Sequence, residues 1–388
     1  MTHRQPSLFR SSHKKGFSLP SAGQIAFCLM SCFCLVLVLR NADAAVDYMG
    51  RGLTLCATTV IPSLFPFMVI SELLVASGAG EALGRLFSRV MKWIFGLSGS
   101  GASALFLGSL CGFPVGARTA VSLYDRNMIS RTECEHLLTF VNNPSSAFLI
   151  TAVGVSLFGN RKLGMVLYGV VLGSGFLVGF LARFFLRRGQ EPAEHPHFPS
   201  GLHLRGVETF TGAVTSAADG MMTVCAYVIF FSALTGVLGC MFHPTTPVGE
   251  TLYACLYGFL EMTGGVSMAS ALDNGGMGLI LTAAFAGWSG VSVHCQVLTI
   301  CGGRGLSFRP YLIAKAVQGL LCGAVMTVLL CVNPDWINPA VGTVMDAIAV
   351  FSSWKEITVP AIVTNVVFGV GFVLSRLLGL AGNQKTAR

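Results

Sequence analysis

The sequence predicts an all-α polytopic membrane protein with about eight to ten membrane segments. Of its 388 residues, 53% are hydrophobic and only 11% are charged, and the mean hydropathy is +0.70. Soluble domains carry about 25% charged residues, so much of this apolar surface has to face lipid. At about 20 apolar residues per span, the chain has room for roughly eight to ten spans.

The basic residues give a formal net charge of +8. They cluster in short hydrophilic stretches, as cytoplasmic loops of membrane proteins do, and are not interleaved with aromatic residues as in nucleic-acid-binding proteins. The 13 Cys lie mostly inside apolar segments without a paired CxxC motif, which favours small buried side chains over disulfides or a metal site. We expect no metal, no cofactor and no nucleic-acid partner; the expected partners are the lipid bilayer and a small solute.

Changes in composition divide the chain into four units. The first combines a basic N-terminus with an apolar run, Ile25–Leu39. This run is similar to a secretory signal, but no A-x-A-like site closes it before Asp43, so we predict a membrane helix with a cytoplasmic N-terminus. A Pro- and His-rich stretch later in the chain predicts a polar linker between two repeats. The units are 1–44 (basic N-terminus and first helix), 45–189 (first repeat), 190–205 (linker) and 206–388 (second repeat).

Within both repeats, apolar runs alternate with amphipathic stretches that suit the membrane interface. The predicted apolar runs are 60–78, which carries Pro62, Pro66 and Glu72, and 163–186, 221–242, 311–331 and 357–380. The predicted amphipathic stretches are 45–59, 81–96 and 206–220. Two further apolar runs are interrupted, 137–158 at Asn142–Ser146 and 251–272 at Gly264-Gly265 beside Glu261.

The stretch Gly108–Ser130 is apolar enough for a membrane, yet Gly112, Pro114 and Gly116 interrupt it and Arg118 follows. Backbone groups freed in hydrocarbon cost several kcal/mol each unless protein or water satisfies them. Secondary transporters use such broken helices near the midplane to build substrate sites. We therefore predict a broken helix next to a solute-binding site.

A similar stretch, Ala286–Phe308, lies in the second repeat. The residues that correspond at one constant sequence separation are Gly112 with Gly290, Gly116 with His294, and Arg118 with Gln296. This register predicts a second break at Gly290 and an internal repeat. Whether the repeat is inverted depends on the number of crossings, which broken helices leave open.

Several longer motifs run from about Pro62 to Gly323. They are PSLFPFMVISELL, CGFPVGARTA, LTFVNNPSSAFLITAVG, FLEMTGG, and GVSVHCQVLTI followed by FRPYLIAKAVQG. Together they resemble the YlbJ-type (also called SpoVV) sporulation integral membrane proteins with nucleoside-recognition (Gate) domains.

The resemblance implies tandem Gate-like domains, a pattern shared with concentrative nucleoside carriers and the membrane part of ferrous-iron transporters. It also implies a protein made in the mother cell and placed in the outer forespore membrane. There the family is implicated in moving dipicolinic acid toward the spore. A homo-oligomer or other sporulation membrane proteins are the expected protein partners.

Three polar residues near the two breaks are candidates for substrate binding. Arg118 is the first, because a charged group at membrane depth costs at least a few kcal/mol and is retained for a reason. Its alternative roles are to snorkel to the interface or to pair with Asp125 on the same helical face. His294 and Gln296 occupy the corresponding place in the second repeat, although a membrane His is often only hydrogen-bonded to a carbonyl.

Two other groups carry polar atoms in apolar runs. The amides and hydroxyls of Asn142, Asn143, Ser145 and Ser146 can bind a carboxylate or a ring nitrogen, or they can satisfy the backbone that Pro144 frees. Glu72 and Glu261 are possible coupling carboxylates. Either one can carry a proton or balance the charge of Arg118.

We interpret the chain as a membrane transporter or permease for a small anionic metabolite, with dipicolinic acid as the candidate that the resemblance implies. A nucleoside-type or other solute carrier, and a structural or assembly protein of the forespore membranes, are the alternatives. An enzyme is not expected, because no HExxH or GxSxG motif is present. No GxxxxGK[ST] loop is present either, so nucleotide hydrolysis by this chain is not expected to supply the energy.

Overall fold

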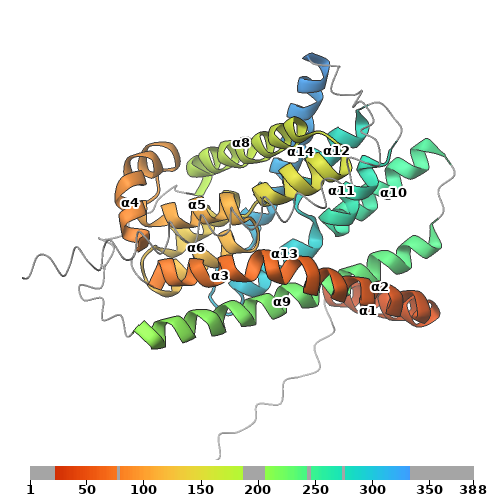
Figure 1. Ribbon diagram of the computed structural model, residues 1–388, viewed down its shortest axis with the longest axis horizontal. Helices are drawn as coiled ribbons and strands as arrows, with labels where there is room; N and C mark the ends of the chain where they lie inside the picture. Colours follow the sequence, from red (N-terminus) through yellow and green to blue (C-terminus); the bar gives the residue numbers. More distant parts are fainter. Residues whose placement is uncertain (1–21, 77–78, 187–205, 243–245, 273–275, 333–388) are drawn as a thin grey trace, which may run out of the picture.

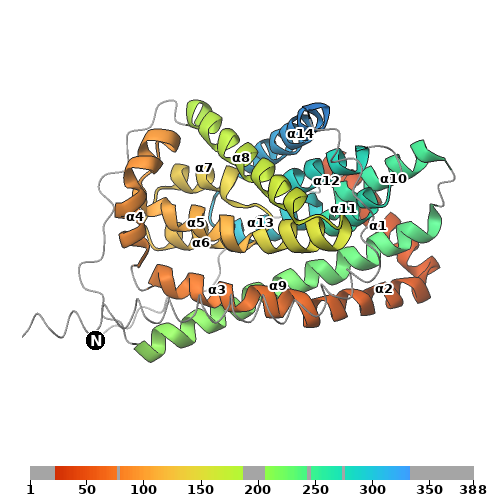
Figure 2. The same ribbon diagram turned by 45° about the horizontal axis from the view of Figure 1, so that its top comes forward.

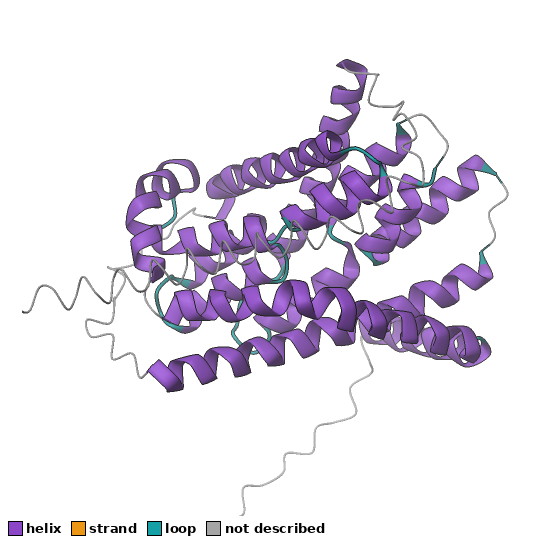
Figure 3. Ribbon diagram, viewed as in Figure 1, coloured by secondary structure: helices purple, strands orange, loops and turns teal. Residues whose placement is uncertain are grey.

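The computed structural model describes residues 22–76, 79–186, 206–242, 246–272 and 276–332. The N-terminal residues 1–18, the linker 190–205 and the predicted last span 357–380 lie outside the described residues. The described parts consist of helices and loops, without a strand (Figure 3). The helices are α1 (Ala22–Arg40), α2 (Ala42–Leu55), η1 (Cys56–Val60), α3 (Ile61–Ala76), α4 (Ala79–Val90), η2 (Met91–Phe95), η3 (Gly99–Gly101), α5 (Ala102–Cys111), α6 (Val115–Asp125), α7 (Arg131–Val141), η4 (Phe148–Leu157), α8 (Arg161–Leu186), α9 (Gly206–Met241), α10 (Pro247–Leu260), α11 (Met262–Ser270), α12 (Met277–Trp288), α13 (Gly290–Cys301) and α14 (Arg309–Val332).

Four stretches in the described residues are long and apolar enough to cross a membrane. They are Arg161–Leu186, Val207–Met241, Met277–Cys301 and Arg309–Val332. A fifth candidate is the pair Gly84–Phe95 and Gly99–Cys111, which is bent by 102°. Shorter apolar helices accompany them at Ser31–Arg40, Leu64–Ala76 and Phe148–Leu157. The predicted class, an all-α polytopic membrane protein with broken helices, is confirmed.

Two long helical rods lie side by side along one edge of the molecule (Figures 1 and 2). One is the continuous run α2–η1–α3 and the other is α9. They are antiparallel, since Cys56 Sγ lies 3.8 Å from the Cys225 carbonyl whereas Arg118 bridges Glu72 to Ser216. The predicted division of 206–242 into an amphipathic and an apolar piece is therefore wrong. Packing against the first rod keeps α9 continuous over 36 residues.

The first repeat contains two helix breaks that touch each other. Helix α5 ends at Cys111 and α6 begins at Val115, while Gly112 has the positive φ of +77° that favours glycine. A Cβ on Gly112 would collide with the backbone of Ser145 in the break between α7 and η4. Gly108 and Gly116 face the Val141 carbonyl with no space for a side chain, so these glycines permit the close approach of three chain segments.

The second repeat contains a similar pair of breaks. Helix α12 ends at Trp288 and α13 begins at Gly290, and a Cβ on Gly290 would meet the backbone of Met262. The break between α10 and α11 lies at Glu261, not at Gly264-Gly265 as expected. Glu261 is extended and caps α11 with its own carboxylate, so the two glycines continue the helix.

Helix α14 lies among the elements of both repeats. It packs on α12, α8 and α7, and its fully buried residues include Tyr311, Lys315 and Gln318. One apolar cluster joins α5, α6 and α7 to α13 and α14, and another joins η4 and α8 to α11, α12 and α14. The breaks are therefore held between two apolar cores.

Candidate functional site: a polar cavity beside the first break

A cavity of about 860 Å³ lies between helices α3, α6, α9 and α13. Its wall includes four of the residues named from the sequence: Glu72, Pro114, Arg118 and Gln296. The cavity lies within the range of about 300–1,000 Å³ that is usual for small-molecule sites. Helices α3 and α6 lie in the predicted first repeat and α9 and α13 in the predicted second repeat, so the cavity wall combines elements from both halves of the chain.

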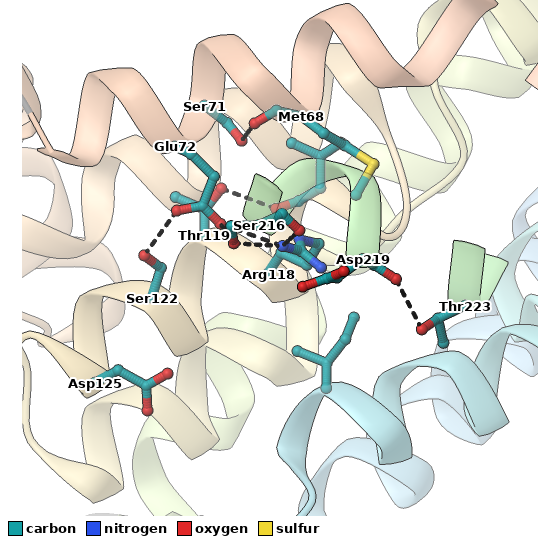
Figure 4. A network of polar contacts seen from close by, with 12 residues as sticks. Met68, Ser71, Glu72, Arg118, Thr119, Ser122, Asp125, Ser216, Asp219 and Thr223 are labelled. Atoms are coloured by element: carbon teal, nitrogen blue, oxygen red, sulfur yellow. Dashed lines mark hydrogen bonds and ion pairs between the residues drawn. The ribbon is translucent and has the colours of Figure 1, made fainter. Parts of the chain in front are cut away.

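Arg118 lies in the first turn of α6, just beyond the break, and its side chain is only 15% exposed. Its Nη2 donates to the Ser216 carbonyl at 2.7 Å, to Ser216 Oγ at 3.0 Å and to Glu72 Oε1 at 3.4 Å (Figure 4). The alternative partner Asp125 is wrong, because Asp125 accepts from Arg304 instead. Arg118 therefore joins α6 to α3 and α9.

Glu72 is the acceptor at the centre of this network and is 12% exposed. Besides Arg118, the hydroxyls of Ser122 and Ser216 each lie 3.3 Å from its carboxylate (Figure 4). The antiparallel rods bring Glu72 of α3 opposite Ser216 of α9. The Arg118 guanidinium lies against Gly220, where a Cβ would overlap it. The three donors around the largely buried Glu72 carboxylate and the close contact of Arg118 with Gly220 restrict the geometry of this ion pair.

A second ion pair lies on the wall of the same cavity. Arg304, in the loop after α13, donates through Nε to Asp125 Oδ1 at 2.8 Å and to Oδ2 at 2.9 Å. Asp125 is the last residue of α6, so this pair joins α6 to the loop after α13. The hydrogen bond with Asp125 raises the pKa of the Arg304 guanidinium above its usual value. Both side chains are about 40% exposed, as expected for a pair near the cavity mouth.

The structure separates two residues that the sequence placed together. Gln296 is buried and lines the cavity. His294 lies two residues earlier on α13, and positions i and i+2 point in different directions on a helix. His294 instead faces Tyr311, whose hydroxyl lies 3.0 Å from Nδ1, and its ring packs edge-on against Trp288. Only Gln296 of the two reaches the solute cavity.

Asn142 and Asn143 belong to a buried polar cluster that includes two residues not found from the sequence, Lys315 and Gln318. Lys315 Nζ donates to the Asn142 carbonyl at 3.0 Å, and Gln318 Nε2 donates to Asn143 Oδ1 at 2.8 Å. The Asn142 amide also lies 3.4 Å from the Tyr311 hydroxyl. The sequence did contain a feature that points to Lys315, because Lys315 is the one charged residue between Arg309 and the end of α14.

The remaining candidates satisfy backbone groups at the breaks. Ser145 Oγ accepts from the Phe148 amide at 3.2 Å, and Ser146 Oγ donates to the Leu110 carbonyl at 3.5 Å. Glu261 accepts from the amides of Thr263 and Gly264 at 2.9 and 2.6 Å. These contacts are those of capping residues, and none of the three residues lies in the wall of the solute cavity.

The described residues contain no group of three or more His, Cys, Asp or Glu side chains that could hold a metal ion. The cavity wall instead offers guanidinium groups, carboxylates, hydroxyls and an amide. Such a donor set binds a small polar solute through charge-assisted hydrogen bonds. The arrangement defines a multi-pass membrane protein with a solute-sized polar cavity between broken helices.

Comparisons with known proteins identify the family. Residues 57–175 match the Gate family, described as nucleoside recognition. The chain is 30% identical over 331 residues to the sporulation integral membrane protein YlbJ of Bacillus subtilis (strain 168), covering 77% of this chain and 80% of that protein. The chain therefore belongs to the YlbJ family of sporulation integral membrane proteins. No solved structure matches the chain.

Proposed function

We propose that this protein moves a small anionic solute across the outer forespore membrane during sporulation, with dipicolinic acid as the candidate. The observation that carries the proposal is that part of the Arg118 guanidinium has donors not used in hydrogen bonds within the described part of the chain. All three of its hydrogen bonds in the described part of the chain use Nη2, which leaves the donors on Nη1 and Nε available. A guanidinium binds a carboxylate through two parallel hydrogen bonds, and the cavity beside Arg118 is large enough for the solute.

Dipicolinate carries two carboxylates that flank a ring nitrogen. One carboxylate would bind Arg118, and the amide of Gln296 and the hydroxyl of Ser216 would serve as further donors. Glu72 forms an ion pair with Arg118. An entering carboxylate would compete with Glu72 for the Arg118 guanidinium. Proton uptake by Glu72 would release Arg118 for the solute, so Glu72 is the coupling carboxylate of this proposal.

The decisive experiment is uptake of labelled dipicolinate into vesicles that contain only this protein. We expect saturable uptake that unlabelled dipicolinate inhibits and that nucleosides do not. Arg118→Gln should abolish uptake, whereas Arg161→Gln serves as the control, since Arg161 is an exposed residue at the start of α8 that does not line the cavity. Equal uptake into vesicles without the protein would refute transport.

A second candidate function is nucleoside transport, which the match to the Gate family favours. The same vesicles distinguish the two solutes, because uptake of a nucleoside without uptake of dipicolinate would support this alternative. A purely structural role predicts that neither solute enters and that apolar replacements of Arg118 and Glu72 leave spore formation normal.

A further inference from the structure

The side chain of Lys315 is fully buried in α14, and the proposed solute site does not use it. Lys315 forms no ion pair with a carboxylate in the described part of the chain. The free energy needed to bury an unpaired ammonium is several kcal/mol, and ionisable residues inside a membrane are functional candidates by default. The burial of Lys315 therefore needs an explanation that packing does not give.

The number of acceptors around Lys315 indicates its protonation state. An ammonium has three N–H donors, but Nζ meets two acceptors: the Asn142 carbonyl at 3.0 Å and Gln318 Oε1 at 2.8 Å. The Gln318 amide nitrogen donates to Asn143 Oδ1 and to the Val171 carbonyl. Those two bonds fix the Gln318 oxygen toward Lys315. Two acceptors match the two N–H groups of a neutral amine.

The titratable side chains around this cluster add no negative charge. They are His294 of α13, and Tyr311 and Cys322 of α14. His136 of α7 instead contacts the Gly179 carbonyl at 2.8 Å. Among the described residues, the hydrogen-bond acceptors of Lys315 Nζ are the Asn142 carbonyl at the end of α7 and the Gln318 amide oxygen on α14. A proton on Lys315 would thus be a net positive charge between the two repeats.

The cluster also contains an acceptor for a third N–H. Asn142 Oδ1 is buried and has no hydrogen-bond partner among the described residues. It belongs to the residue whose carbonyl already contacts Nζ. The Asn142 amide holds the Tyr311 hydroxyl only weakly, at 3.4 Å. Turning the Asn142 oxygen toward an ammonium would break that contact and with it the link from Asn142 through Tyr311 to His294.

We propose that Lys315 is a proton-binding site, neutral in the state seen here and charged in another state of the transport cycle. A proton from water on one side adds to the lone pair of Nζ, and the ammonium later returns it to water on the other side. Its charge would offset the charge of the anion. The coupling role of Lys315 rests on the proposed function, whereas the protonation state of Lys315 does not depend on it.

The protonation state is tested directly with full-length protein labelled with ¹³C at the lysine Cε. Comparison with Lys315→Met assigns the Lys315 resonance. At about pH 8, exposed lysines with a usual pKa near 10.4 are charged, and we expect the Lys315 resonance at the position of a neutral amine. The proposal would be overturned if the Lys315 resonance lies at the ammonium position at about pH 8 and changes only when the exposed lysines titrate. This outcome does not depend on what the protein transports.

Coupling is tested in vesicles with an imposed pH gradient and labelled dipicolinate. Wild type and the control Lys162→Met, altered at an exposed lysine at the start of α8, should show about tenfold greater accumulation with an inward proton gradient. Lys315→Met should still exchange internal for external solute but should respond less to the gradient than the control does, because Glu72 is then the one coupling group of the proposal that remains. If Lys315→Met responds to the gradient as the control does, coupling at Lys315 is refuted. If the wild type exchanges no solute, the transport proposal fails and the NMR result still decides the protonation state.

Discussion

At the scale of single residues, two of the guanidinium groups in the cavity wall each have a carboxylate partner within the chain. Arg118 pairs with Glu72 and Arg304 with Asp125. The first pair is the more buried, so its strength depends most on geometry. A salt bridge shielded from water is strongly affected by the loss of one partner, whereas an exposed pair contributes roughly 0–1 kcal/mol.

We expect Arg118→Lys to insert and fold normally but to bind the anionic solute poorly. A lysine cannot reproduce the two parallel hydrogen bonds of a guanidinium. Loss of a desolvated charge partner costs about 2–5 kcal/mol, which corresponds to a loss of affinity of roughly 30-fold to several-thousand-fold. Solute binding to purified protein measures this directly. Wild-type affinity in Arg118→Lys would mean that Arg118 is an anchor rather than a ligand.

Gly220→Ala provides a second test at this site, with opposite effects on stability and function. Alanine is favoured over glycine in a helix by about 1 kcal/mol, so α9 itself should not be weakened. A Cβ at this position would overlap the Arg118 guanidinium, which should displace it and lower solute affinity at least tenfold. The control is Gly173→Ala in α8, where a Cβ meets nothing within 4 Å and the residue does not line the cavity. Equal affinities of the two variants would contradict the described position of Arg118.

At the scale of helical elements, each repeat brings its two breaks into contact. Gly112 touches the break at Ser145, and Gly290 touches the break at Met262. Cys substitution at Gly116 is a poor test of how the repeats approach each other, because Gly116 faces the Val141 carbonyl without space for a side chain. The pair Asp125 and Arg304 is a better test, since it joins α6 to the loop after α13 at the surface.

We expect cysteines at positions 125 and 304, in a background without other cysteines, to be crosslinked by a short bifunctional reagent. If transport requires the two repeats to move apart at this end of the cavity, the crosslink should reduce uptake at least tenfold, and reduction of a cleavable reagent should restore it. Each single Cys variant treated in the same way is the control. Full uptake by the crosslinked protein would show that this contact stays closed during transport.

At the scale of the whole molecule, two antiparallel rods form one side of the cavity and the broken helices form the other. The rods come from different repeats, and so do α6 and α13. Binding sites at the interface of two repeats are usual in secondary transporters. The division of the chain at residues 190–205 and the internal repeat remain predictions, and the arrangement of the rods is what a repeat would produce.

The orientation of the chain in the membrane is also a property of the whole molecule. Basic residues next to membrane segments resist translocation, so the chain after α8, which continues into Arg187 and Arg188, should be cytoplasmic. After Arg188, a reporter enzyme that works only in the cytoplasm should be active, and one that works only outside the cytoplasm should be inactive. A fusion at the loop after Leu157, at the opposite end of α8, is the control and should give the reverse result. Extracytoplasmic activity after Arg188 would contradict the prediction.

The membrane class and several helix boundaries could be predicted from local composition, and the family from long motifs. Low charge and long apolar runs require a membrane environment, and the interruption at Gly112, Pro114 and Gly116 predicted the break that separates α5 from α6. The helices Arg161–Leu186 and Arg309–Val332 lie within two residues of the predicted runs. Apolar length and glycine positions are properties of neighbouring residues in the chain, so the sequence contains them.

Only the tertiary structure decided which polar groups meet. Arg118 and Asp125 share a helical face, yet Glu72 and Ser216 are the partners of Arg118 because α3 and α9 pack antiparallel beside α6. Lys315 lies opposite Asn142 only because α14 packs on the end of α7. Both contacts join segments more than 40 positions apart. Hydrogen bonds and ion pairs depend on distances of a few ångströms in space, and those distances are fixed by packing rather than by spacing along the chain.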